Sequence, residues 1–293
     1  MSTRVDTVKD AIVGTIKGTG EIVNAVTTTV SDSVATALRQ SGHVGKALTG
    51  AVTDVATGVI EGTSQVGGDI GKASRGAAIG VLQGAKDVGA NAVDAVGSMV
   101  ETLVKTTADV GGDIGGATRR ALEGTVQGAS RVGVSTVDAV SAAATGAMKG
   151  IGGVTRTATS TVVEVARGAI EGAHEVGGDG AAAAKGTLLG VLRGTKDLGT
   201  ESVRTIGAGA GSVVRTTAEV GGDVGVAAKG AVEGAIAGAK DIGVDASEAA
   251  SAAATGALKA AGDISTAAVD QVKRAATGVI AGVKVVVKEP FKA

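Results

Sequence analysis

The tetrapeptide Val-Gly-Gly-Asp occurs four times, beginning at Val66, Val110, Val176 and Val220. A glycine-rich segment followed by an acidic residue could open a phosphate-binding loop. A dinucleotide-binding fingerprint needs an apolar strand before it and a βαβ unit around it, and a P-loop needs Gly-Lys followed by Ser or Thr. The sequence offers neither context, so we expect a structural role for this motif.

Other residues that could do chemistry are poorly placed for it. The two histidines, His43 and His174, lie far apart and the chain has no cysteine, so we predict no metal site. Lys-Asp neighbours, as at Lys86 and Lys240, are expected to solvate and align a polar face rather than to act as acid and base. Ser and Thr are abundant, but no set of nucleophile, base and orienting residue is found among them. We therefore predict that the protein is not an enzyme and uses no cofactor.

The composition indicates thin, closely packed apolar layers. The 293 residues include 50 Gly, one Phe and no Trp, Tyr or Cys, and the apolar residues are mostly Ala and Val. A formal net charge of −1 argues against nucleic acid as a partner, because little would drive the release of counterions from phosphates. We find no signal-peptide core and no apolar segment that could span a bilayer. The expected location is the cytoplasm or the periphery of a membrane or lipid surface.

An eleven-residue repeat positions all of these residues. Residues 11–285 form 25 rows of eleven without insertion or deletion, and we label the columns a to k. Columns a, b, e, f, h and i contain no Asp, Glu, Lys or Arg in any row. Eleven residues in three turns correspond to about 3.67 residues per turn, which places these six columns on one face of an α-helix. A β-strand has a period of two and would change faces in every row, so the pattern predicts an amphipathic helix.

A longer repeat of 110 residues, or ten rows, relates the segment from Gly80 to the segment from Gly190. We therefore divide the chain into a lead-in (1–10), a repeat region (11–285) with tandem units 66–175 and 176–285, and a tail (286–293). The unbroken phase favours one very long helix, or a few long helices, packing side by side in a right-handed or nearly straight supercoil. Hairpins of a few rows, turning at the Gly-Gly pairs, are the competing interpretation.

Glycine prefers particular columns of this grid. Because each interior glycine costs a helix about 0.5–1 kcal/mol relative to alanine, we expect burial against another surface to compensate. Nine rows carry Gly in both column d and column h, and these small residues four apart predict close helix packing. The predicted packing residues are Gly14, Gly18, Gly58, Gly62, Gly80, Gly84, Gly124, Gly128, Gly146, Gly150, Gly168, Gly172, Gly190, Gly194, Gly234, Gly238, Gly278 and Gly282.

The Val-Gly-Gly-Asp rows belong to the same grid. Their first glycine, in column b, is expected to open the apolar face of a continuous helix to a close neighbour. Their second glycine lies on the polar side, so any hinge should occur at Gly68, Gly112, Gly178 or Gly222.

The chain resembles the eleven-residue repeats of perilipins and synucleins in segments such as "GTVQGASRVGVSTVDAV" and "GAMKGIGGVTRTATSTVV". Late embryogenesis abundant proteins share the period. The resemblance lies in period and composition and covers nearly the whole chain. The resemblance implies a repeat region that is disordered in water and folds into a helix on a lipid surface.

The sequence thus supports two functions of different kinds. In the first, the protein is non-catalytic and structural, and its apolar faces self-associate into a bundle, filament or coat, so that its partner is another copy of itself. In the second, single helices coat a lipid droplet, a membrane surface or a hydrophobic granule through the same face. A role as an ice-binding or desiccation protectant rests only on the Thr and Ala content.

Overall fold

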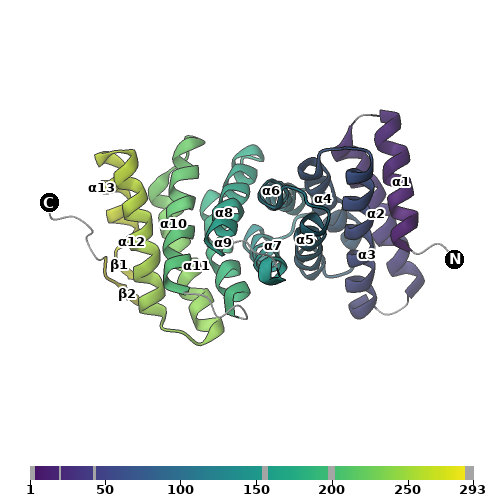
Figure 1. The fold of residues 1–293 in the computed structure, drawn as a ribbon. Helices are drawn as coiled ribbons and strands as arrows, with labels where there is room; N and C mark the ends of the chain where they lie inside the picture. The colour runs from purple at the N-terminus through teal and green to yellow at the C-terminus, as the bar shows by residue number, and fades with distance from the viewer. Residues whose placement is uncertain (1–3, 20, 42–43, 154–157, 197–201, 288–293) are drawn as a thin grey trace.

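The computed structural model describes residues 4–19, 21–41, 44–153, 158–196 and 202–287. Within them the chain forms thirteen α-helices, one short 3-10 helix and two short strands (Figure 1). The elements are α1 (Arg4–Thr19), α2 (Ile22–Ser41), α3 (Val44–Gln65), α4 (Ile70–Asp87), α5 (Ala92–Asp109), α6 (Ile114–Val132), α7 (Thr136–Gly150), η1 (Ile151–Gly153), α8 (Ala158–Glu175), α9 (Gly180–Thr195), α10 (Ser202–Glu219), α11 (Val224–Ile242), α12 (Ala246–Ile264), α13 (Thr266–Ala276), β1 (Gly278–Ile280) and β2 (Val283–Val285).

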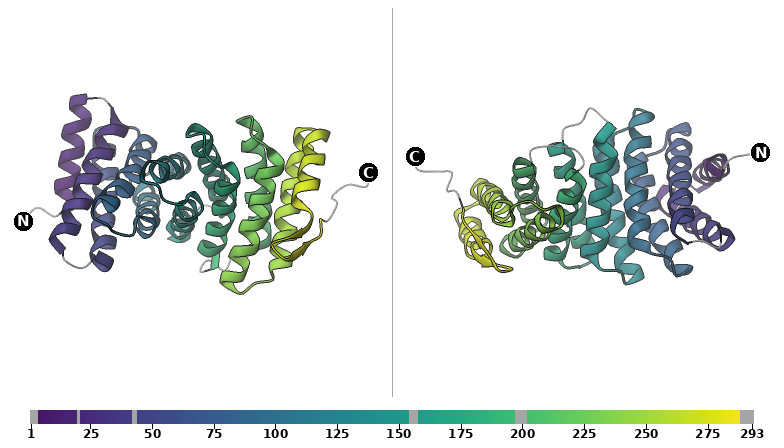
Figure 2. Two further views of the ribbon diagram at one scale, coloured as in Figure 1. Left: turned by 180° about the vertical axis from the view of Figure 1, so that it is seen from behind. Right: turned by 90° about the horizontal axis from the view of Figure 1, so that it is seen from below.

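The helices stack in two layers. Each helix packs mainly on the helix two positions earlier, so α1, α3, α5, α7, α9, α11 and α13 form one layer and α2, α4, α6, α8, α10 and α12 form the other. Consecutive helices pack against each other across the two layers. Figures 1 and 2 show the helices following one another in chain order, with the chain ends at opposite ends of the molecule. This arrangement is a helical solenoid, in which each repeat contacts its neighbours.

Side-by-side packing of helices is therefore confirmed, whereas the very long helix and its supercoil are wrong. The described helices have between 11 and 22 residues. From α4 to α12 they begin at residues 70, 92, 114, 136, 158, 180, 202, 224 and 246, at a constant interval of 22 residues. One helix with its turn therefore equals two rows of eleven. The eleven-residue phase is kept along the chain because each helix–turn unit must match the length of the unit on which it stacks.

The Val-Gly-Gly-Asp motif forms the turn between two helices, not part of a continuous one. Gly67 adopts a left-handed conformation with φ 65°, which glycine tolerates and other residues rarely adopt. The N–H of Gly68 donates to the carbonyl of Thr63 at 2.9 Å, closing the end of α3 as in a Schellman motif. The carboxylate of Asp69 then accepts from the N–H of Lys72 at 2.9 Å and caps α4. The four residues therefore stop one helix and start the next.

The column-b glycines serve the same purpose elsewhere, so the expectation that they open an apolar face is wrong. Left-handed glycines end α3, α4, α5, α6, α8, α10 and α11, at Gly67, Gly89, Gly111, Gly133, Gly177, Gly221 and Gly243. In each case the reason is the missing Cβ, which removes the steric cost of a positive φ.

The two ends depart from the predicted grid. Helix α1 already begins at Arg4, inside the predicted lead-in. The last row, 275–285, is helical only to Ala276 and then forms an antiparallel hairpin in which Gly278 pairs with Val285. Gly278 and Gly282 have φ values of 94° and 80°, which shape this hairpin and are incompatible with a right-handed helix. The prediction that these two glycines pack helices is therefore wrong.

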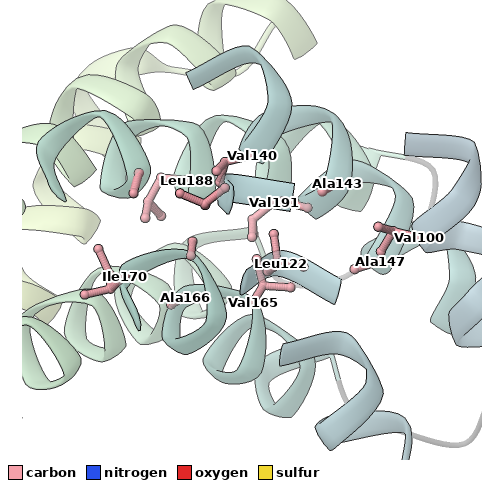
Figure 3. Close-up of a cluster of buried hydrophobic side chains, with 14 of the residues drawn as sticks. Val100, Leu122, Val140, Ala143, Ala147, Val165, Ala166, Ile170, Leu188 and Val191 are labelled. Carbon is pink, nitrogen blue, oxygen red and sulfur yellow. The ribbon is translucent and has the colours of Figure 1, made fainter. Parts of the chain in front are cut away.

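The duplicated unit contains five helix–turn units, an odd number. Helices α4 to α8 lie in residues 66–175, and their counterparts 110 residues later are α9 to α13. Counterparts consequently lie in opposite layers, as α7 and α12 do. Figure 3 shows how the core between the layers is built from small side chains such as Val140, Ala143 and Val165, with a few larger ones such as Leu122.

Candidate functional site

The glycines of columns d and h bring neighbouring helices of one layer into backbone contact. In α4, a Cβ placed on Gly80 would lie 2.6 Å from the carbonyl oxygen of Thr27 and 2.8 Å from the Cβ of Val30, both in α2. A Cβ on Gly84 would lie 2.6 Å from the carbonyl oxygen of Ser31. Carbon atoms do not approach oxygen this closely, so only glycine fits at this separation of the helices. We call such a surface of the earlier helix a seat, and the glycines of the later helix its seat glycines.

Seat glycines recur along both layers, always on the helix that follows by two. They are Gly58 and Gly62 of α3 on α1, Gly80 and Gly84 of α4 on α2, Gly124 and Gly128 of α6 on α4, Gly146 and Gly150 of α7 on α5, Gly168 and Gly172 of α8 on α6, Gly190 and Gly194 of α9 on α7, and Gly234 and Gly238 of α11 on α9. The close approach offsets the low helix propensity of glycine by allowing continuous van der Waals contact between backbones.

The first glycine pair of the grid, Gly14 and Gly18, differs from the seat glycines. A Cβ on Gly14 of α1 would meet nothing within 4 Å, and the surroundings of Gly18 lie outside the described residues. Conversely, sequence reasoning missed seat glycines four residues before column d. Gly76 meets Val23 and Val26 of α2, and Gly186 meets Val137 and Val140 of α7. Their signal was present, because they extend the four-residue spacing to a third glycine.

The predicted hinge glycines lie in the turns between helices. Gly68, Gly112, Gly178 and Gly222 each follow a left-handed glycine. A Cβ on Gly112 would lie 2.9 Å from side-chain carbons of both Ile70 and Thr107. These positions therefore fit tightly against neighbouring side chains where the chain reverses.

A charged cluster joins α4, α6 and α8. The side chain of Glu123 is only 1% exposed, and its Oε2 accepts from Nη1 of Arg120 at 2.7 Å and of Arg75 at 3.4 Å. Arg75 also donates from Nη2 to Oε2 of Glu175 at 2.6 Å, and Gln127 donates to the same oxygen. Buried charges are tolerated only when paired and hydrogen-bonded, and here one arginine spans three helices.

Two pKa values in this cluster are displaced. Burial raises the pKa of Glu171 above the usual value for a carboxyl group, and a hydrogen bond with Glu123 acts in the same direction. The hydrogen bond to Glu123 raises the pKa of Arg120. The cluster therefore favours the charged form of Arg120 while it disfavours ionisation of Glu171.

Ion pairs between helices of one layer recur at two sequence separations, and Arg119–Glu171 and Arg167–Glu219 join residues 52 apart. Arg75–Glu123, Lys185–Glu233, Arg193–Asp241 and Arg215–Asp263 all join residues 48 apart. Since two helix–turn units contain 44 residues, stacked helices are offset by about one further turn. Asp241, the neighbour of Lys240 on the predicted polar face, pairs with Arg193 at 2.6 Å. These ion pairs are thus compatible with the register in which the helices stack.

Two open grooves occupy equivalent places in the long repeat. One of about 750 Å³ lies between α5 and α7, with Arg193 of α9 at its rim. The other, of about 850 Å³, lies between α10 and α12, with Val286 at its rim. Gly97 in the first corresponds to Gly207 in the second, 110 residues later. In the second groove, the segment after β2 therefore takes the position that α9 has in the first groove.

No group of three or more His, Asp or Glu side chains in the described part of the chain could hold a metal ion. His174 is exposed on α8, and His43 lies outside the described residues. None of the described helices is long and apolar enough to cross a membrane. No protein-family model matches the chain, and none of the curated proteins is significantly similar to it.

Proposed function

We propose that the protein is a non-catalytic structural protein whose apolar helix faces associate with one another within a single chain to form an extended two-layer scaffold. The supporting observation is the burial of the uncharged columns between helices. In row 77–87, for example, the six residues Ala77, Ala78, Val81, Leu82, Gly84 and Ala85 are all buried. The face that could meet a lipid surface or another protein is therefore occupied by the protein's own helices.

The outward surface agrees with such a role. Among the described residues, the exposed large apolar side chains lie near helix ends or in the C-terminal hairpin: Val110, Val226, Val244, Ile264, Val279 and Val286. They do not form the continuous stripe by which an amphipathic helix enters a lipid surface. Coating of lipid by single helices would require the stack to open and the seats to separate.

Circular dichroism and small-angle X-ray scattering of the full chain in lipid-free buffer test the proposal. We expect high helicity and the scattering profile of an elongated particle of one chain. A random-coil spectrum that becomes helical only on addition of phospholipid vesicles would overturn it and support the lipid-coat function instead.

A further inference from the structure

The seat of α12 is occupied by the C-terminal hairpin instead of a helix. In its counterpart α7, the seat is formed by Val137, Ser141, Ala144 and Met148, and α9 lies on it through Gly186, Gly190 and Gly194. The matching residues of α12, 110 positions later, are Ser247, Ser251, Ala254 and Leu258. The same surface therefore exists at the end of the other layer, where no helix of the described chain follows α12 in its layer.

Strand β2 contacts this seat through the same serine position. Ser251 Oγ accepts from the N–H of Val286 at 3.3 Å, just as Ser141 Oγ accepts from Nη1 of Arg193 of α9 at 3.2 Å. Ser247 Oγ donates to the carbonyl of Lys284 at 3.1 Å. Figure 1 shows β1 and β2 beside α12. The hairpin thus substitutes for the next helix of the layer.

The hairpin is a weak substitute for a helix. Its strands have three residues each, and isolated two-stranded hairpins are marginally stable in water. Ile280 and Val285 are each 5% exposed and anchor it, whereas Val279 is 75% exposed and Val286 is 55% exposed. A helix with seat glycines would bury far more apolar surface on the same seat.

Helix α1 has the features of such a helix, and its surface at Gly14 is open. Gly14 and Gly18 occupy columns d and h, as Gly190 and Gly194 do in α9, and a Cβ on Gly14 would meet nothing within 4 Å. The opposite face of α1 is already used, because its own residues Val8 and Ile12 receive the seat glycines of α3. In a second copy, α1 can therefore follow α12 while its own stack stays intact.

The charges fit the same register. The pairs Arg193–Asp241 and Arg215–Asp263 join column g of one helix to column k four rows later. If α1 of a second copy continued the grid on α12, the same rule would join Lys259 in column g to Glu21 in column k. Both of these side chains are exposed.

We propose that the C-terminal hairpin is a cap on the seat of α12, and that its displacement lets α1 of a second copy occupy this seat, joining chains head to tail. The proposal rests on the scaffold function proposed above and extends it from one chain to several. It predicts that self-association is suppressed while the hairpin is in place.

The test detaches the hairpin within the full chain. The double variant Ile280→Asp/Val285→Asp places two carboxylates at the buried anchors and should remove the cap. Size-exclusion chromatography with light scattering should give a mass of two or more copies that grows with concentration, with unchanged helicity per residue. The unaltered chain should give the mass of one copy under the same conditions.

Further variants identify the contact. Gly14→Leu added to the uncapped variant should restore the mass of one copy, whereas Gly50→Leu should not, because Gly50 is an equally open helical glycine on α3. Lys259→Glu should weaken association, and Glu21→Lys should then restore it.

Two results would refute the proposal that the hairpin is a cap. In one, the Ile280→Asp/Val285→Asp variant is helical and keeps the mass of a single copy. In the other, its association is insensitive to Gly14→Leu. Should the hairpin substitutions lower helicity, Val286→Pro, which removes the N–H bonded to Ser251 and adds no buried charge, replaces them with the same expected outcomes. A random coil in the unaltered chain would instead refute the scaffold function.

Discussion

Replacing a seat glycine by alanine should destabilise the protein, although alanine is the better helix former. At Gly84 the new Cβ would lie 2.6 Å from the carbonyl oxygen of Ser31 and 3.1 Å from its Cα, so the backbones of α4 and α2 must separate. Overpacking of this kind costs about 1–3 kcal/mol. The gain in helix propensity recovers about 1 kcal/mol. We therefore expect Gly84→Ala to lower the free energy of unfolding by up to about 2 kcal/mol, and Gly84→Leu to lower it further.

A matched control at Gly50 should change the free energy of unfolding in the opposite direction. Gly50 is also helical, but a Cβ there would meet nothing within 4 Å, so Gly50→Ala should stabilise the protein by about 0.5–1 kcal/mol. Lys86→Gln, on the exposed side of α4 near Gly84, should change little. Urea denaturation followed by circular dichroism measures all of them, with the slope of the transition reporting whether unfolding stays cooperative. Equal stabilisation by Gly84→Ala and Gly50→Ala would contradict the close packing at the seat.

Three further outcomes follow from the turns and the charged cluster. Gly111→Ala should cost about 1–2 kcal/mol in urea denaturation because its φ of 69° is left-handed; no loss would show that the turn is not needed. Arg120→Met should cost about 1–3 kcal/mol because the buried Glu123 loses its shortest ion pair and keeps Arg75, whereas Arg215→Met, in an exposed pair, should cost at most about 1 kcal/mol; similar losses would contradict the role of burial. The raised pKa of Glu171 means that its contribution to stability is present below the usual carboxyl pKa and is lost as pH rises through the folded-state pKa. Glu171→Gln should therefore gain stability relative to the unaltered chain as pH rises from about 4 to 7, and a difference that does not change with pH would refute this.

Much of the local structure could be predicted from the sequence. The separation of charged from uncharged columns specified helices, because only a period near 3.6 keeps six columns on one face. The Gly pairs of columns d and h specified small contact surfaces. The ends of α3, α5, α8 and α10 were equally present in Val-Gly-Gly-Asp, whose glycine suits a left-handed stop and whose aspartate suits a helix start. The motif was misread because the constant phase also fits an uninterrupted helix.

The partners of these surfaces could not be predicted, because the grid alone is compatible with a helix that meets itself, a second chain or a lipid. The structure selects stacking on the helix two units earlier, and the ion pairs between residues 48 apart follow from that choice. The hairpin after Ala276 was also hidden, because residues 275–285 keep the column pattern while Gly278 and Gly282 adopt positive φ values.

By itself, the sequence determined that this chain forms amphipathic helices with small, glycine-containing contact faces and a charged opposite side. These properties depend on residues close in sequence, whose side chains share a helix face whatever the helix meets. Only the tertiary structure decided that each helix lies on the helix two units before it, and that a hairpin covers the last seat of one layer. The stacking depends on contacts between residues 44 or more positions apart, where the close approach allowed by glycine, and not the helical period, sets which surfaces meet. The place of the hairpin depends on contacts of Lys284 and Val286 with serines of α12 that lie 37 and 35 positions earlier.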